Sequence, residues 1–133
     1  MSLDEERRQD MIYKYLEKSD LFWKEAVVGY EMKMWSMTAN RMYYATLNAV
    51  RALLLKDNHP THSHNGTKQL FGQYYVITGA VSAEQGKLYS QLETMRERAD
   101  YDCYFNATRE DIAQKFQPTK SLIDRIKQLL KEQ

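Results

Sequence analysis

The chain has 133 residues, of which 43% are hydrophobic and 28% are charged, as in an ordinary folded protein with one domain and one core. Its formal net charge of +1 excludes a broad basic surface that holds nucleic acid by bulk electrostatics, so any nucleic-acid site has to be local. Ten tyrosines are more than so small a core needs, and some of their hydroxyl groups are expected at an interface or in a groove.

The first half of the chain predicts two long helices. Apolar residues three or four positions apart indicate an amphipathic helix over residues 4–33. A second helix is predicted to begin at Ser36 or Thr38, either of which can cap it, and to run to about Lys56 before Pro60. Because this second helix is apolar on nearly all sides, we expect it to be central.

A short helix and a third long helix are predicted next. Residues 58–65 form a polar loop, and a short helix follows near residues 66–77. The pair Thr78 and Gly79 breaks it. Ser82 and Gln85 then have the spacing of a capping box, which opens a helix that ends near residue 100.

The last predicted helix begins after Asn106 or Thr108 and runs almost to the end of the chain. Pro118 is expected to kink it or to split it in two, because the proline ring excludes the hydrogen bond to the preceding turn. With no strand pattern and no repeat, the chain predicts an all-α fold: an up-and-down four-helix bundle with an additional short helix, in a single domain over residues 4–131.

A narrow polar stripe interrupts the second helix. At the helical period its members fall within roughly 100° of one face, while apolar residues cover the rest. A surface helix would instead carry a broad polar side with charges of both signs. The stripe therefore predicts a cleft or a partner on that face, and it consists of Asn40, Arg41, Tyr44, Asn48 and Arg51.

A second polar cluster lies on the helix that ends near residue 100, where Tyr89, Glu93, Arg96 and Asp100 share one side. One interpretation is a simple surface ion pair between Arg96 and Asp100, four residues apart. The other is a site, because Asp100 or Asp102 can provide the acceptors that the stripe arginines need if the two helices are neighbours. The second interpretation places two polar stripes face to face.

Six segments, in order and at compatible spacing, resemble the HEPN domain family. More narrowly, they are similar to its small stand-alone prokaryotic branch, which ends in an Arg-x-x-Ala-Asp-Tyr motif. The match extends from about Met11 to about Leu130. The segments are Asn40–Ala45, Arg51–Leu54, His64–Gly66, Leu70–Gly72, Thr78–Gly79 and Arg96–Tyr101.

The resemblance implies a helical bundle, usually a homodimer, with a polar groove near the dimer interface. It also implies binding of RNA or a nucleotide, and pairing with a separately encoded minimal nucleotidyltransferase in a toxin–antitoxin-like system. Ribonuclease branches of the family cleave RNA without metal, using an arginine followed four to six residues later by a histidine. Here Arg96 matches the arginine, but Tyr101 stands where the histidine is expected.

This departure favours binding over catalysis, because a tyrosine with a pKa near 10 is a poor proton acceptor at neutral pH. We predict a binding module with no cofactor, whose ligand residues are Arg41, Tyr44, Asn48, Arg51, Arg96 and Asp100. Two alternatives stay open. One is a metal-independent ribonuclease toxin in which Arg96 and Tyr101 are the candidate catalytic residues, and the other is a purely structural dimer locked by the polar groups.

Other chemistries have little support. His59, His62 and His64 lie close together on a loop without the partners of a zinc site, so no metal is expected, and His64 is assigned to capping or packing. The absence of an apolar signal core or membrane span predicts a cytoplasmic protein without membrane contact. Whether a partner modifies Tyr101 or Tyr104 stays open.

Overall fold

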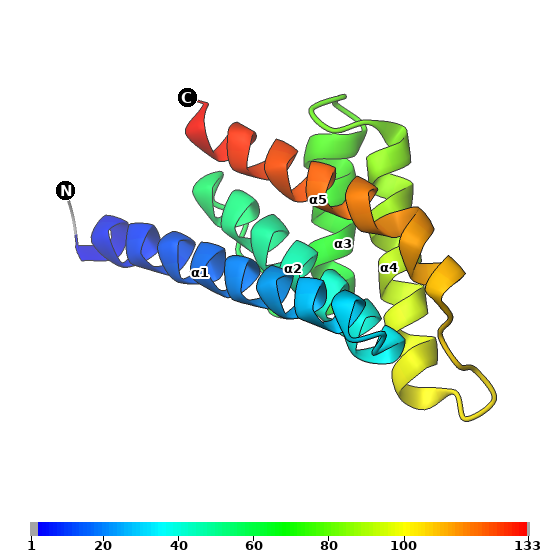
Figure 1. Cartoon of the computed structure of the whole chain (residues 1–133). Helices are drawn as coiled ribbons and strands as arrows, with labels where there is room; N and C mark the ends of the chain where they lie inside the picture. The colour runs from blue at the N-terminus through cyan, green and yellow to red at the C-terminus, as the bar shows by residue number, and fades with distance from the viewer. Residues whose placement is uncertain (1–2, 133) are drawn as a thin grey trace.

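The computed structural model describes residues 3–132, and within them it is all-α with no strand, as the sequence predicts (Figure 1). A short π-helical turn, η1, directly follows the third helix. The elements in chain order are α1 (Leu3–Glu31), α2 (Trp35–Lys56), α3 (His64–Phe71), η1 (Gly72–Val76), α4 (Ala83–Tyr101) and α5 (Arg109–Lys131). None of the helices in this described part of the chain is long and apolar enough to cross a membrane.

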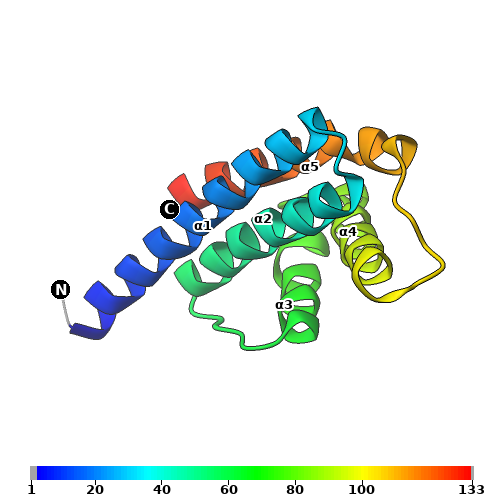
Figure 2. The same cartoon turned by 60° about the horizontal axis from the view of Figure 1, so that its bottom comes forward.

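Helix α2 is the centre of the molecule, because α1, α3, α4 and α5 all pack against it. Figures 1 and 2 show α1 and α5 running along α2, while α3 and α4 cross it on another side. The central position predicted from its apolar surface is therefore confirmed. Each neighbour of α2 meets a different part of its circumference, and this distribution determines where the polar stripe points.

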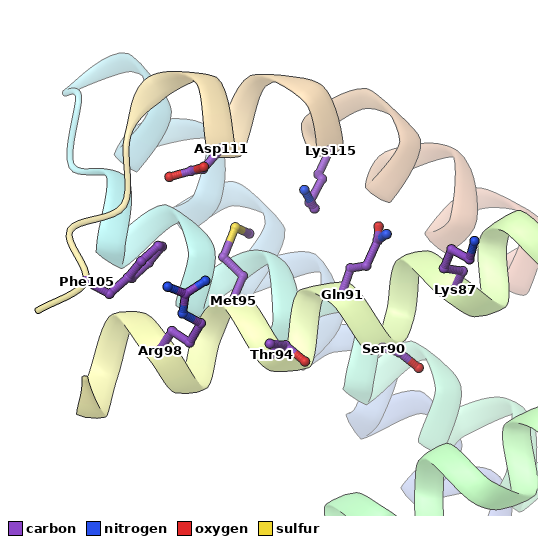
Figure 3. Close-up of a pocket in the computed structure, with 9 residues that line it drawn as sticks. All are labelled: Lys87, Ser90, Gln91, Thr94, Met95, Arg98, Phe105, Asp111 and Lys115. Carbon is purple, nitrogen blue, oxygen red and sulfur yellow. The ribbon is translucent and has the colours of Figure 1, made fainter.

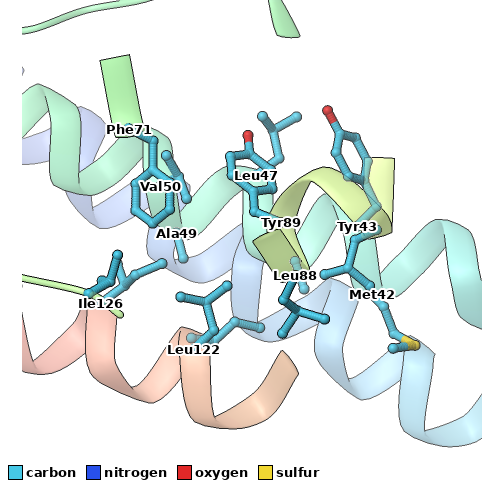
Figure 4. Packing of buried hydrophobic residues seen from close by; sticks show 14 of the residues in the cluster. Met42, Tyr43, Leu47, Ala49, Val50, Phe71, Leu88, Tyr89, Leu122 and Ile126 are labelled. Carbon is cyan, nitrogen blue, oxygen red and sulfur yellow. The ribbon is translucent and has the colours of Figure 1, made fainter. Parts of the chain in front are cut away.

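The hydrophobic core lies between α2 and the helices that follow it in the sequence (Figure 4). Aromatic and branched aliphatic side chains of α2 pack on those of α3, α4 and α5, and they are almost completely removed from water. The residues labelled in Figure 4 are Met42, Tyr43, Leu47, Ala49, Val50, Phe71, Leu88, Tyr89, Leu122 and Ile126.

Local signals set most of the helix ends. The capping box of Ser82 and Gln85 is present, and a second one pairs Thr108 with Asp111 at the start of α5. Gly79 adopts a φ of +83° in the turn before α4, a conformation that glycine enters without steric cost. The predicted break at this position is thus confirmed, as is the start of the last helix at Thr108.

The predicted caps of the second helix are wrong. Helix α2 begins at Trp35, and its N-cap residue, Met34, makes no side-chain capping bond. Thr38 lies inside the helix, where its hydroxyl donates to the carbonyl oxygen of Met34 at 2.8 Å. The reason lies in the tight turn after α1, in which the backbone N–H of Met34 donates to the carbonyl of Gly29 and leads straight into α2.

Two other boundaries also differ from prediction. The third helix begins at His64 rather than Gly66, because Ser63 caps it by accepting the backbone N–H of Gly66. Pro118 lies inside α5, which stays one continuous helix from Arg109 to Lys131, so the alternative of two separate helices is wrong.

Candidate functional site

Arg96 is the buried charge of the site. Its side chain projects from α4 toward α2, and only 5% of the residue is exposed. The guanidinium carbon lies 5.0 Å from the ring centroid of Tyr43, 5.6 Å from that of Tyr44 and 6.0 Å from that of Tyr101. Three aromatic faces therefore surround the cation and provide cation–π stabilisation.

The charge of Arg96 has no close acceptor among the described residues. The carboxylate of Asp100 lies 3.8 Å from Nη1 and that of Glu97 lies 3.9 Å from Nη2, both beyond hydrogen-bond distance. Nε is buried and unpartnered within the described chain. Burying a guanidinium with an unpaired N–H donor costs free energy of folding, so this geometry favours binding of an anion next to Arg96.

A hydrogen-bonded network lies beside Arg96 and joins α2, α3 and α4. The hydroxyl of Tyr43 is 3.1 Å from Nδ1 of His64 and 3.4 Å from the carboxylate of Glu93. Lys68 donates to the other oxygen of Glu93 at 3.0 Å. Burial, followed by the negative charge of Glu93, raises the pKa of Tyr43, so its phenol stays protonated.

His64 is the functional candidate that sequence reasoning missed. Burial lowers its pKa first, and the positive charges of Arg51 and Arg96 lower it further, so the imidazole is neutral at pH 7. Its assignment to capping is wrong because Ser63 caps α3, whereas a packing role agrees with its ring contacts to Tyr43 and Tyr44. In the sequence, only its membership of the motif His64–Gly66 pointed to a functional role for His64. No sequence spacing shows that this residue and Arg96 are neighbours in the fold.

The polar stripe of α2 is divided among its neighbours instead of facing one cleft. At one edge Arg41 donates to Glu25 of α1 at 2.9 Å and also to Asn40. At the other edge Asn40 donates to Asp100 of α4 at 3.2 Å. Arg41 therefore does not bind Asp100 directly, as one prediction had it, because its side chain turns toward Glu25 of α1. Asn40 contacts both residues and lies between them.

Asn48 and Arg51 occupy the middle of the stripe. Asn48 is buried and donates to the carbonyl of Tyr44, one turn back on its own helix, at 2.7 Å. Arg51 is half-buried, and its Nε lies 3.5 Å from Oγ1 of Thr67 on α3. The structure thus directs Arg51 toward α3 and His64, whereas the amide of Asn48 is already used by the backbone.

The end of α4 is open to solvent. Tyr101 is 80% exposed although its ring reaches the guanidinium of Arg96. Asp102 accepts the backbone N–H of Tyr104 at 2.9 Å in the loop that follows, so its predicted role as acceptor for the α2 arginines is wrong. Cys103 and Tyr104 are exposed in the same loop.

A separate open cavity lies between α4 and α5, where Figure 3 shows Gln91, Lys115 and Arg98 pointing into the space between the helices. Its volume is about 360 Å³, and Met95 and Phe105 add apolar surface. Arg98 follows Arg96 by two positions, which places the two side chains about 160° apart around the helix. This cavity is therefore not part of the Arg96 site.

No group of three or more histidine, cysteine, aspartate or glutamate side chains within residues 3–132 is placed to hold a metal ion. Of the three clustered histidines, His59 stacks on Tyr74 with ring centroids 3.9 Å apart. The chemistry available near Arg96 is therefore that of cations, phenols, one imidazole and carboxylates.

Comparison with known proteins identifies relatives over most of the chain. The HEPN domain family model matches residues 12–129. A Methanocaldococcus jannaschii protein named "Putative toxin" is 31% identical over 107 residues, which are 80% of this chain and 79% of that protein. A Thermotoga maritima protein named "UPF0332 protein" is 30% identical over 93 residues, 70% of either chain. A second M. jannaschii "Putative toxin" is 22% identical over 111 residues, 84% of this chain and 76% of its own length.

Proposed function

This chain belongs to the HEPN domain family, and from that premise we propose that it is a toxin-like module that binds RNA or a nucleotide through Arg96. Its proposed partner is a separately encoded minimal nucleotidyltransferase, and its proposed state is a cytoplasmic homodimer. The toxin names of two relatives support the toxin–antitoxin context. The partner and the dimer come from the family resemblance.

One observation carries the binding proposal: Arg96 is buried, yet both carboxylates near it lie beyond hydrogen-bond distance and its Nε is unpartnered among the described residues. A planar guanidinium fork matches the two oxygens of a phosphate and forms short charge-assisted bonds with it. The exposed ring of Tyr101, at the edge of the same cation, offers a face on which a base can stack.

Arg51 and Lys68 extend the positive charge around this centre. Arg51 lies close enough to His64 to lower its pKa, and Lys68 forms an ion pair with Glu93 in the adjacent network. With a formal net charge of only +1, the chain has no broad basic surface, so a phosphate would be bound by these few residues. We therefore expect a local contact with one or two phosphates and a shallow dependence on salt.

Fluorescence anisotropy with a labelled single-stranded RNA, in chelator, tests the proposal. Arg96→Lys keeps the positive charge but removes the fork, and we expect the dissociation constant to rise about tenfold, which corresponds to roughly 1.4 kcal/mol. Arg98→Lys is the matched control, because it makes the same exchange two positions along α4, on the other side of the helix. It should bind like the native protein.

Equal RNA affinity for both variants, with reduced stability only for Arg96→Lys, would favour the structural alternative. In that case the chain from Glu25 through Arg41 and Asn40 to Asp100 would serve only to join α1, α2 and α4. Thermal unfolding measured on the same samples separates the two results.

A further inference from the structure

Two open cavities between α4 and α5 join into one groove. The first has a volume of about 360 Å³ and the second a volume of about 620 Å³. They share three lining residues, Lys87, Gln91 and Lys115, so each cavity continues into the other. Figure 3 shows Gln91, Arg98 and Lys115 directed into the first cavity. The joined cavities form the α4–α5 groove, which follows α4 from its first turn to its last.

The groove carries positive charge that has no acceptor. Lys87, Arg98 and Lys115 line it. Within residues 3–132, the charged groups of these three side chains form no ion pair and no hydrogen bond. Unpaired cations that face one cavity attract negative charge, so the groove is suited to an anionic ligand.

The carboxylates of the groove do not neutralise these cations. Asp111 is already used at the start of α5, where it accepts the backbone N–H of Thr108 at 2.9 Å and the hydroxyl of the same residue at 3.0 Å. Glu84 lies at the other end of the groove, in the first turn of α4. Cations therefore outnumber carboxylates around the first cavity.

The cations are spread along the groove. Lys87 and Arg98 are eleven positions apart on α4, which is about three turns, or about 16 Å, at the helical rise. Lys115 reaches the same space from α5. One small anion cannot contact both ends, whereas an extended peptide of about five residues has this length. The spacing thus indicates an elongated polyanion.

The uncharged lining distinguishes a peptide from a nucleic acid. Among the described residues, Phe105 is the one aromatic ring on the groove, and the guanidinium carbon of Arg98 lies over it, 4.4 Å from the ring centroid. Successive bases of a single strand stack on free aromatic faces, which this groove lacks. The carboxamides of Gln91 and Gln114 instead offer donors and acceptors together, as backbone N–H and C=O groups require.

We propose that the α4–α5 groove binds an extended acidic segment of a partner protein. Carboxylates of the segment pair with Lys87, Arg98 and Lys115, and an adjacent apolar side chain packs on Met95 and Phe105. This surface is separate from the Arg96 site, because the side chains at positions 96 and 98 lie about 160° apart around α4. Binding of the segment leaves the Arg96 site accessible.

Fluorescence anisotropy with a labelled synthetic peptide tests the proposal on the full-length protein. The probe has about five consecutive glutamates beside one leucine, and the control peptide has glutamine in place of each glutamate. Arg98→Gln and Lys115→Gln each remove one cation of the groove. Lys18→Gln removes the same charge from an exposed position on α1, outside the groove, and is the matched control.

We expect the acidic peptide to bind the native protein and Lys18→Gln equally, and each groove variant to raise the dissociation constant about tenfold. The glutamine peptide should bind about tenfold more weakly or not at all, and added salt should weaken binding of the acidic peptide. In NMR spectra, the side-chain amide signals of Gln91 and Gln114 should shift when the acidic peptide is added. Thermal unfolding confirms that each variant is folded.

Three results would overturn the inference. The first is no saturable binding of the acidic peptide, or equal binding of the glutamine peptide. The second is a loss of affinity in Lys18→Gln as large as in the groove variants, which would mean unspecific attraction. The third is that Arg98→Gln and Lys115→Gln weaken binding of a labelled single-stranded RNA and not of the peptide, which would make the groove a nucleic-acid surface.

The proposed function fails separately from this inference. Arg96→Lys should weaken binding of RNA and leave binding of the acidic peptide unchanged, whereas the groove variants should do the reverse. An RNA-binding protein that ignores the peptide, or a peptide-binding protein that ignores RNA, would each refute one proposal alone.

Discussion

At the residue scale, the pair of His64 and Arg96 shows how burial sets charge states. Arg96 keeps its charge because a guanidinium does not lose its proton in proteins, and three aromatic rings partly compensate for the lost water. His64, which titrates easily, responds to the same surroundings by becoming neutral. One environment thus holds a permanent cation beside a proton acceptor.

This difference predicts a pH dependence of folding stability. The pKa of His64 is lower in the folded protein than its ordinary value of 6.5, so between these two values the unfolded chain binds more protons. The free energy of unfolding should therefore fall as pH decreases below 6.5, until His64 is protonated in the folded state too. Urea unfolding at several pH values measures this free energy for the native protein and for His64→Asn. The variant should lose less stability than the native protein as the pH falls below 6.5. An identical decrease in both proteins would contradict the prediction.

Residue identities were predictable where partners are close in sequence. The proximity of Arg96 and Asp100 follows from their separation of four positions on one helix. The acceptor of Arg41 did not follow, because Glu25 belongs to another helix and only tertiary packing brings it near. The same limit applies to His64, whose side chain reaches the site only through the placement of α3.

At the element scale, the packing of the end of α1 against the start of α2 depends on Gly29. A Cβ atom at this position would lie 2.6 Å from Oγ1 of Thr38 and 2.9 Å from the terminal methyl carbon of Met37. The hydroxyl of Thr38 is also bonded to the carbonyl of Met34, so it cannot easily move away. Glycine is therefore required by space and not by backbone conformation.

We predict that Gly29→Ala lowers the free energy of unfolding by about 1 to 3 kcal/mol, the usual cost of an overpacked contact, although alanine is the better helix former. Gly72→Ala is the matched control. A Cβ atom there would meet nothing within 4 Å, and we expect no loss or a gain of up to about 1 kcal/mol. Chemical denaturation of the three proteins compares them, and a Gly29→Ala protein as stable as the native one would refute the steric argument.

The elements themselves were largely predictable, since apolar periodicity and two capping boxes locate the helices. The errors fall where local rules compete with packing. Thr38 has the chemistry of a cap, but the turn from α1 starts α2 three residues earlier. Pro118 is compatible with one continuous α5, as the structure shows.

At the scale of the whole molecule, the arrangement leaves an apolar face of α1 uncovered. Leu21 and Val28, seven residues apart on one side of α1, are 54% and 53% exposed, and Met32, directly after the helix, is 66% exposed. Exposed apolar stripes of this kind often mark contacts between proteins. This face is where we expect the proposed homodimer to form.

Sedimentation velocity tests the dimer. The native protein should sediment as a dimer, and Val28→Glu should shift it toward monomer, because a carboxylate buried in an apolar interface loses its hydration. Ile77→Glu is the control, since Ile77 is an exposed apolar residue after η1, away from α1. A native monomer at all concentrations, or a dimer unaffected by Val28→Glu, would contradict this placement.

The central position of α2 also has a consequence for the order in which the protein becomes competent during synthesis. Contacts between α1 and α2 are local in the chain, so this hairpin can form while the later helices are still being made. The site requires Tyr43 from the hairpin, His64 from α3 and Arg96 near the end of α4. A nascent chain that ends before Arg96 therefore presents a folded hairpin without the buried cation, and the site is completed only after α4 has left the ribosome.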